Sequence, residues 1–477
     1  MLCEFEESWP LSEAQSGIWF VQESDPESPV LNNGERYELR GNLDVEAFEK
    51  AVATMVSESE SLRMRFFVTD DGPRQCLDPD REYPLRIVDL SEDPNPEGAV
   101  QARVREELSS PLDMVHDPLY AHTLFRLGED HYVWYQQAHH LIVDGYTFML
   151  LARRVAEVYS GLVAGADIGE PLGSFRDLMT QTESYESGPE RQEDARFWTE
   201  YLDGAPQHTA LKRHEGKIGK RVLSSSRYVS AEQLARIEQV AELQGTRWKQ
   251  LMMALTAVYT HRWTGEEDIL LGLPVTGRTT ELSRSVPSMC SNVIPLRLNI
   301  GPSRSVAAVA QDVAASLRSC LSYQRHPVTA TKRLLGQTPQ NMREFGPLIN
   351  IMSFDYDLKF GDLSCEGDLL AQGIIEELRI NVLHRRGSLR IVFDANSAVF
   401  TEEELDQYAD SFIRLLDFLC QDPTALVGEM DLASEEQLSR VVNEFSVGES
   451  RIFADRSVHE VFQERVAQAP DAVALVF

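Results

Sequence analysis

One stretch of the chain, His139-His140-Leu141-Ile142-Val143-Asp144-Gly145, decides both its local fold and its chemistry. It follows an apolar strand pattern at 132–138 and precedes an apolar helical pattern at 148–162, so it lies on the loop between a strand and a helix. Side chains alternate along a strand, and the two histidines should therefore point to opposite sides. We expect one imidazole to face a cleft and the other to pack inward.

The residue types of this loop favour a reactive site over a buried core histidine. A histidine that faces a cleft can act as a general base or can hydrogen-bond a reacting amine at neutral pH. Two histidines that point apart are poorly placed to hold one metal ion, so we expect no metal here. Asp144 could take the proton of a nearby histidine, or could pair with an arginine and fix the loop. Gly145 permits a positive φ and a close backbone approach to a substrate.

Helix and strand patterns alternate on both sides of the loop, which indicates a mixed α/β class. In the first part, the patterns predict a helix capped by Asp44 at 45–58, strands at 63–68 and 85–88, and a hairpin at 122–127 and 132–138. In the second part, they predict helices at 232–244, 248–263, 305–323 and 402–419, and strands at 268–273, 348–354 and 389–393. A polar stretch at 172–204 indicates a connection between two lobes.

Composition argues against several classes of partner. Asp and Glu outnumber Lys and Arg by 76 to 45, and the net charge of −31 repels nucleic acid and anionic membrane surfaces. The chain has no run of about 18 apolar residues, and its start lacks the basic-then-apolar order of a signal peptide, so we expect a cytoplasmic protein. The six cysteines are far apart, without a Cys-x-x-Cys pair, and we expect reduced thiols.

The motif His-His-x-x-x-Asp-Gly resembles the core motif of nonribosomal peptide synthetase condensation domains, in the chloramphenicol-acetyltransferase-like superfamily. Partial matches to five other motifs of that family stand in the family's order: LSEAQSGIW at 11–19, SLRMRF at 61–66, GLPVTGR at 272–278, MCSNVIPLR at 289–297 and YQRHP at 323–327. The resemblance covers 11 to about 431. Its wording is similar to that of enterobactin-type siderophore synthetases, which suggests siderophore biosynthesis.

The chain departs from the family pattern at two motifs but keeps the core motif complete. Glu58-Ser59 stand where the second motif usually carries Arg-His, and Cys290-Ser291 replace an aromatic residue and Val in the fifth. Epimerisation domains usually lack the glycine of the core motif, heterocyclising relatives replace the paired histidines with Asp, and non-catalytic recruitment domains tend to lose them. An acyltransferase that uses a free CoA thioester is a further alternative.

The resemblance implies two chloramphenicol-acetyltransferase-like lobes in a V-shaped pseudo-dimer, with a tunnel at their junction. It places the lobes at 8–175 and 205–443, an inter-lobe connection at 176–204 and a linker at 444–456. Residues 457–477 resemble the start of an adenylation domain, truncated here. Their pattern predicts an amphipathic helix at 457–469 and a strand at 470–477.

The activity implied is amide formation between a donor acyl thioester and an acceptor aminoacyl thioester. Both would be carried on phosphopantetheine, by an upstream donor and a downstream acceptor carrier domain, with an adenylation domain adjacent in the same chain. The condensation domain itself should need no metal and no bound cofactor, because the thioester already stores the driving force.

The resemblance also assigns roles to single residues. It implies that His140 is catalytic and that His139 and Gly145 support the motif. It implies that Asp144 is structural and pairs with Arg278 across the lobe junction. Three further residues are expected to line the tunnel: Asn292, Pro274 and Gly277.

Overall fold

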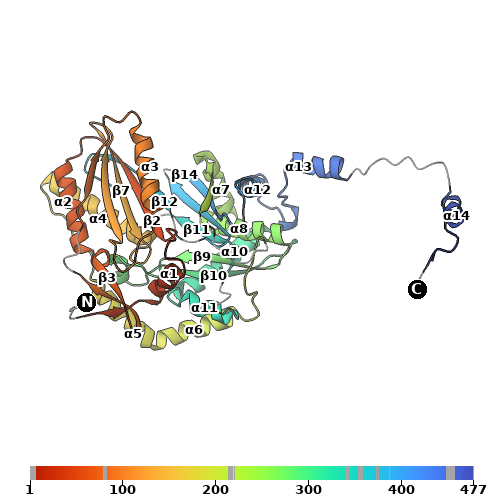
Figure 1. Cartoon of the computed structure of the whole chain (residues 1–477), viewed down its shortest axis with the longest axis horizontal. Coiled ribbons are helices and arrows are strands. Elements are labelled where there is room, and N and C mark those ends of the chain that lie inside the picture. Colours follow the sequence, from red (N-terminus) through yellow and green to blue (C-terminus); the bar gives the residue numbers. More distant parts are fainter. Residues whose placement is uncertain are drawn as a thin grey trace. The chain divides into compact units, whose positions relative to one another are not determined.

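The structure is a computed structural model that describes residues 7–78, 83–212, 219, 221–338, 343–352, 358–371, 373, 375–385, 387–446 and 457–475. The chain divides into two compact units, Met1–Leu432 and Ala433–Phe477. Helices and strands alternate through the first unit (Figure 1), which confirms the mixed α/β class. No helix in the described ranges has both the length and the apolar character needed to cross a membrane.

A five-stranded sheet forms the first lobe, with the strand order β12-β2-β7-β6-β5. Its strands are β2 (Asn32–Arg40), β5 (Arg86–Asp89), β6 (Tyr120–Arg126), β7 (His131–His139) and β12 (Ser364–Ala371). Three helices accompany it: α2 (Val45–Glu58), α3 (Pro96–Leu108) and α4 (Gly145–Ala164). Side-chain alternation along β7 separates the two faces, because Trp134 packs edge-on against Phe48 of α2 while Tyr135 joins the apolar cluster of α3.

A small three-stranded sheet and α1 adjoin this lobe. The strands β1 (Trp9–Pro10), β3 (Met64–Thr69) and β4 (Gly72–Leu77) pair in the order β1-β4-β3, after the 3-10 turn η1 (Glu60–Arg63). Helix α1 (Glu13–Ser24) begins with a capping box in which Ser12 and Gln15 exchange hydrogen bonds. Its buried face carries Trp19 together with two glutamines, Gln15 and Gln22, which matter for the site.

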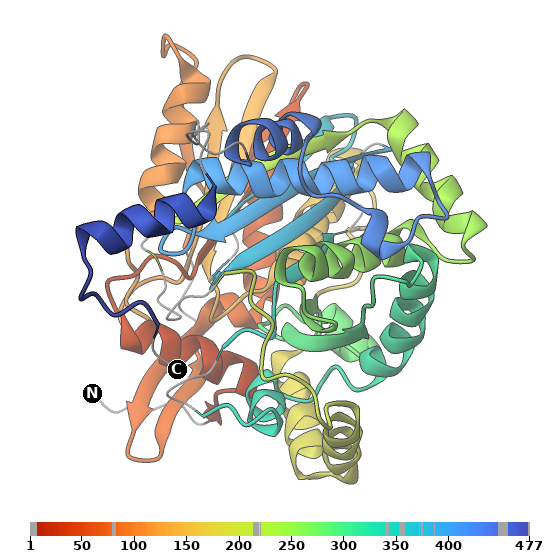
Figure 2. The same ribbon diagram turned by 90° about the vertical axis from the view of Figure 1, so that its right-hand side faces the viewer.

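The second lobe contains a six-stranded sheet with the order β10-β9-β11-β13-β14-β8. Its strands are β8 (Val222–Val229), β9 (Asp268–Val275), β10 (Asn292–Asn299), β11 (Leu348–Met352), β13 (Leu378–Arg385) and β14 (Ser388–Asn396). The helices around it are α7 (Ala231–Leu243), α8 (Trp248–Thr264), α10 (Val306–Ser322) and α12 (Glu402–Gln421), the last of which lies across the strands in Figure 2. The predicted helices of this lobe are therefore confirmed within a few residues.

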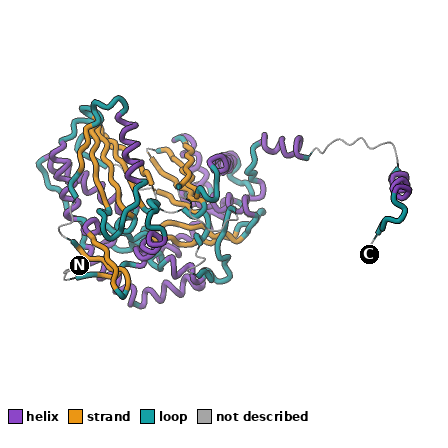
Figure 3. Tube along the Cα trace, viewed as in Figure 1, coloured by secondary structure: helices purple, strands orange, loops and turns teal. Residues whose placement is uncertain are grey.

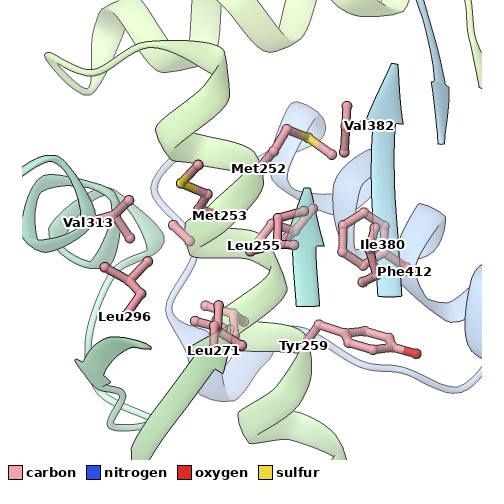
Figure 4. Packing of buried hydrophobic residues seen from close by; sticks show 14 of the residues in the cluster. Met252, Met253, Leu255, Tyr259, Leu271, Leu296, Val313, Ile380, Val382 and Phe412 are labelled. Atoms are coloured by element: carbon pink, nitrogen blue, oxygen red, sulfur yellow. The ribbon is translucent and has the colours of Figure 1, made fainter. Parts of the chain in front are cut away.

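Helix α8 is the centre of the second core. Figure 4 shows its side chains meeting the sheet on one side and neighbouring helices on others, with Leu255 near Ile380 and Tyr259 near Phe412. These four side chains are all below 1% exposed. Because α8 is apolar on nearly all sides, it is buried as a central helix rather than lying on the surface.

Two helices form the connection predicted at 176–204. They are α5 (Phe175–Ser187) and α6 (Pro189–Tyr201), and they are anchored by the buried Tyr185 and Trp198. The short helical segments of the second lobe are α9 (Glu281–Ser285), α11 (Val328–Leu334) and η2 (Val427–Glu429). The polar composition of 176–204 arises because both helices expose one face to solvent, so the connection is helical and not an irregular linker.

Strand β12 corrects the predicted lobe boundaries. Residues 364–371 fall inside the range assigned to the second lobe, yet they pair antiparallel with β2 of the first sheet, with Gly367 opposite Tyr37. The two sheets lie side by side in Figure 3, and β12 completes one edge of the first sheet. This long-range pairing leaves no local pattern in the sequence, which is why the boundary prediction missed it.

The C-terminal unit differs from the prediction in two places. The second lobe was expected to reach 443, but the compact unit ends at Leu432, because α13 (Glu435–Arg440) and the π-helical turn η3 (Val441–Phe445) bury no side chain. Helix α14 (Val458–Gln468) matches the predicted helix. A strand was predicted at 470–477. The structure describes 470–475 of this range, and these residues form no strand. Most of the predicted linker, 447–456, lies outside the described residues.

Candidate active site

His139 is the last residue of β7 and points into the first lobe. Its side chain is almost fully buried, with 1% of its surface exposed. Its Nδ1 accepts a hydrogen bond from the Leu141 amide at 3.2 Å, so Nε2 carries the proton and donates to Gln22 Oε1 at 3.0 Å. Burial lowers the pKa of His139 to about 3, which keeps the ring neutral.

His140 follows on the opposite side, as strand alternation predicts. Its amide donates to the Leu31 carbonyl at 2.8 Å, and its Nδ1 donates to the Val143 carbonyl at 2.8 Å. The proton on Nδ1 leaves Nε2 with the ring's free lone pair. Burial lowers the pKa of His140, although the Val143 carbonyl and the Asp144 charge partly oppose that effect. The ring is therefore neutral at pH 7.

Asp144 caps α4 and ties the loop to the second lobe. One oxygen accepts from the Thr147 amide at 2.8 Å, which starts the helix three residues earlier than predicted. The other accepts from the Cys290 and Ser291 amides at 3.0 and 2.9 Å. Burial alone would raise the pKa of Asp144, but the charge of Arg278 and these hydrogen bonds outweigh it and lower the pKa.

The predicted ion pair between Asp144 and Arg278 is present, with Arg278 Nη1 2.6 Å from Asp144 Oδ2. Both side chains are at most 1% exposed. The other guanidinium nitrogen donates to Thr147 Oγ1 at 2.9 Å and to the Ser288 carbonyl at 2.7 Å, and the group lies 4.8 Å from the centre of the Tyr146 ring. The contact joins α4 of the first lobe to the loop after β9, so it links the two lobes.

The other predicted residues have mixed outcomes. Gly145 is the first residue of α4 and has no positive φ, which corrects that expectation because the helix already fixes its backbone. A side chain there would stand in open space, with no atom within 4 Å. Gly277 does have a positive φ of 66°, and a Cβ would lie 2.1 Å from the Cys290 carbonyl oxygen. Glycine is therefore required at position 277, because a side chain would clash with the Cys290 carbonyl.

Two cavities flank the histidine loop. The first, here called the α1 cavity, has a volume of about 460 Å³ and is bordered by α1, α5, α11 and the segment 289–293 at the start of β10, with His140 on its wall. The second, the inter-sheet cavity, has a volume of about 480 Å³ and is bordered by β2 and β12 of one sheet and by β8, β13 and β14 of the other. Gly373 lines the inter-sheet cavity and lies against the His140 ring.

Asn292 and Gly277, both expected to line a tunnel, lie on the wall of the α1 cavity. The Asn292 amide also donates to the Gln324 and His326 carbonyls at 2.9 and 2.7 Å, which fixes the chain before α11. Pro274 lies within β9 opposite Val293 of β10 and is not among the described residues that line either cavity. The expectation that Pro274 lines a tunnel stays a prediction.

Several residues of the site were not foreseen from the sequence. Gln22 accepts a hydrogen bond from His139, and Gln15 donates one to the Leu141 carbonyl at 3.3 Å. Helix α1 therefore supports the histidine loop through two side chains. Gln15 stands in a motif that could have pointed to it, whereas Gln22 lies one turn beyond that motif. Gly373 has no sequence signal, because its contact with His140 joins residues far apart in the chain. The five described cysteines are free thiols.

The chain matches one family model and is similar in sequence to several known proteins. The family model for the condensation domain matches residues 5–441. A dimodular nonribosomal peptide synthase of Bacillus subtilis (strain 168) is 32% identical over 474 residues, which are 98% of this chain and 20% of that protein. Enterobactin synthase component F of Escherichia coli O157:H7 is 27% identical over 98% of this chain and 36% of its own length. The chain thus spans between a fifth and two fifths of these relatives.

Solved structures show the same fold. The starter condensation domain of rhizomide synthetase, in a complex with C8-CoA and Leu-SNAC, superposes with a TM-score of 0.83 at 32% identity, over 90% of this chain and 98% of that chain. The first condensation domain of the calcium-dependent antibiotic synthetase gives a TM-score of 0.80 at 28% identity, over 90% of this chain and all of that one.

Proposed function

Because the chain belongs to the condensation-domain family, we propose that it joins a donor acyl or peptidyl thioester to an acceptor aminoacyl thioester through an amide bond. Both substrates would arrive on phosphopantetheine arms of carrier domains, one upstream and one downstream, in a longer nonribosomal synthetase. The likeness to enterobactin synthase component F suggests that the product is a siderophore. An adenylation domain would follow in the same chain.

The observation that carries the proposal is the position of His140. Its ring lies on the wall of one cavity and against Gly373, which lines the other. Two carrier arms of similar length could therefore deliver their reacting ends to the same nitrogen from two sides. A single neutral imidazole at that meeting point suits a reaction between an amine and a carbonyl.

The chemistry needs no group beyond these substrates. The acceptor amine attacks the donor carbonyl, the carbonyl carbon–sulfur bond breaks, and the proton lost by the amine ends on the released thiol. The amide stays attached to the acceptor carrier through its own thioester. Aligning two tethered reactants contributes roughly 7–11 kcal/mol in favourable cases.

His140 acts in this scheme mainly by holding the amine. An α-amine with a pKa near 8 is already partly neutral at pH 7. Burial lowers the pKa of His140, which weakens it as a base but leaves Nε2 free to accept a hydrogen bond from the amine. We therefore assign His140 an orienting role, with the proton passing through Nε2 or directly to the leaving sulfur.

Asp144 and Arg278 serve the same reaction from a distance. Their ion pair is fully buried and is surrounded by hydrogen bonds from both lobes. It holds the start of α4, and hence His140, against the second lobe. They are positioning residues, because neither borders the described cavities.

The test uses this chain with two carrier domains loaded in turn with candidate donors and acceptors. Intact-protein mass spectrometry of both carriers should show the donor mass moving onto the acceptor carrier. His140→Ala should abolish that transfer while both carriers remain loaded, and His116→Ala, at an exposed histidine that pairs with Asp113, should leave it unchanged. Transfer from a free acyl-CoA but not from a carrier would overturn the proposal in favour of a CoA acyltransferase.

A further inference from the structure

Gly373 is the described glycine at which an added Cβ would meet the His140 ring. A Cβ at this position would lie 3.0 Å from His140 Cδ2 and 3.5 Å from the reactive Nε2. The first distance is shorter than ordinary van der Waals contact, so a side chain would press directly on the ring. The ring cannot swing away freely, because Nδ1 is bonded to the Val143 carbonyl at 2.8 Å.

The backbone of Gly373 is fixed by the same strand that fixes His140. The Gly373 amide donates to Asn33 Oδ1 at 3.1 Å, and Asn33 is a buried residue of β2. Two residues earlier, the Leu31 carbonyl accepts the His140 amide at 2.8 Å. The start of β2 therefore holds the histidine and the glycine at a set spacing, and that spacing determines the opening beside Nε2.

The two cavities also approach each other at this contact. His140 borders the α1 cavity and Gly373 borders the inter-sheet cavity. Gly373 both lines the inter-sheet cavity and adjoins the His140 ring, so a substrate that approaches Nε2 from that cavity passes beside it, where no side chain occupies the space.

On the basis of the proposed function, we propose that Gly373 is a specificity-determining residue. It sets how large a substituent the substrate from the inter-sheet cavity can carry next to its reacting atom. A side chain at 373 narrows the opening and displaces the imidazole, so the loss of activity grows with the bulk of that substrate. The other substrate, which arrives through the α1 cavity, is affected equally at every size.

The experiment compares Gly373→Ala with the wild-type chain in single-turnover amide formation. Donors of rising bulk at the reacting end (acetyl, propionyl, isobutyryl) are loaded on a carrier, and acceptors (glycyl, alanyl, valyl) are varied separately. In the series whose substrate enters through the inter-sheet cavity, we expect the single-turnover rate constant to fall about 10-fold for the smallest member and about 100-fold for the largest, since a misplacement of about 1 Å can cost roughly 100-fold. The fall along the other series should be constant.

Gly165→Ala is the matched control. Gly165 has a φ of 61°, close to the 57° of Gly373, so alanine meets the same backbone cost at both positions. A Cβ at Gly165 touches nothing within 4 Å. The control should keep wild-type turnover and wild-type ring ¹⁵N signals for His140, whereas Gly373→Ala should shift those signals.

The outcomes separate this inference from the proposed function. A loss in Gly373→Ala that is the same for every substrate, or unshifted His140 signals, overturns the specificity role while leaving amide formation intact. An inactive wild-type chain overturns the proposed function, and the specificity role with it.

Discussion

The loop between β7 and α4 contains two neighbouring regions that the structure treats in opposite ways. In the inner region, formed by His139 and Asp144, every side-chain nitrogen and oxygen has a protein partner, and both groups are buried. In the outer region, formed by His140, Nδ1 is bonded to the Val143 carbonyl, while Nε2 has no hydrogen-bond partner within the described part of the chain. The comparison shows how a rigid, fully bonded support can hold a single unbonded lone pair in place.

The largest expected effect comes from breaking the inner region. Asp144→Ala leaves the Arg278 charge buried without its partner, which costs about 3–5 kcal/mol. We expect urea unfolding to show that loss and amide formation to fall with it.

Asp268→Ala provides the control for this prediction. Asp268 pairs with Arg297 at 2.8 Å, but both side chains are at least a quarter exposed, so the loss should be at most about 1 kcal/mol. Loss of activity in Asp144→Ala with an unchanged free energy of unfolding would contradict the positioning role.

A smaller effect is expected from Gln22, which supports His139 from α1. Gln22→Ala removes the acceptor of the His139 proton and a donor shared by the carbonyls of Asp25, Pro26 and Ser28, at a cost of about 2 kcal/mol. The matched control is Gln233→Ala, which loses one exposed capping bond and should cost less than about 1 kcal/mol. Equal losses in the two variants would mean that the inner region does not depend on α1.

The last of these effects concerns pH and tests whether buried histidines outside the site make the folded chain sensitive to acid. His122 and His139 both have a pKa lowered to about 3 by burial. The unfolded chain therefore binds protons that the folded chain does not, and stability should fall progressively as pH drops from about 6.5 toward 3. His122→Phe removes one such group beside Trp134, away from the loop.

This variant should show a flatter decline of the urea midpoint between pH 6.5 and 4 and unchanged amide formation at pH 7. The wild-type slope in His122→Phe would show that His122 is protonated alike in the folded and unfolded chain.

Local patterns in the sequence predicted the parts of the fold that local chemistry determines. The helix at 45–58 begins after Asp44 and ends at Glu58 as expected, because its cap and apolar spacing lie within those residues. The opposed histidines followed from strand alternation in the same way. The ion pair of Asp144 with Arg278 came from the family resemblance, since the two residues are far apart in the chain.

What could not be predicted depends on contacts between distant segments. Pairing of β12 with β2 and the contact of Gly373 with His140 both join residues more than 200 positions apart. The positive φ expected at Gly145 failed because the capping bond of Asp144 extends α4 over that residue. The amphipathic pattern at 457–469 could likewise not show whether helix α14 is buried. In the structure its side chains are exposed within the C-terminal unit.

The central claim is that His140 presents a neutral ring with a free Nε2. Titration of the ¹⁵N-labelled imidazole by NMR tests it directly, with His140→Gln used to assign the signals. The structure predicts the Nδ1–H tautomer and a pKa below the usual value of about 6.5, so that the ring is neutral at pH 7. An Nε2–H tautomer, or a pKa above that value, would contradict it.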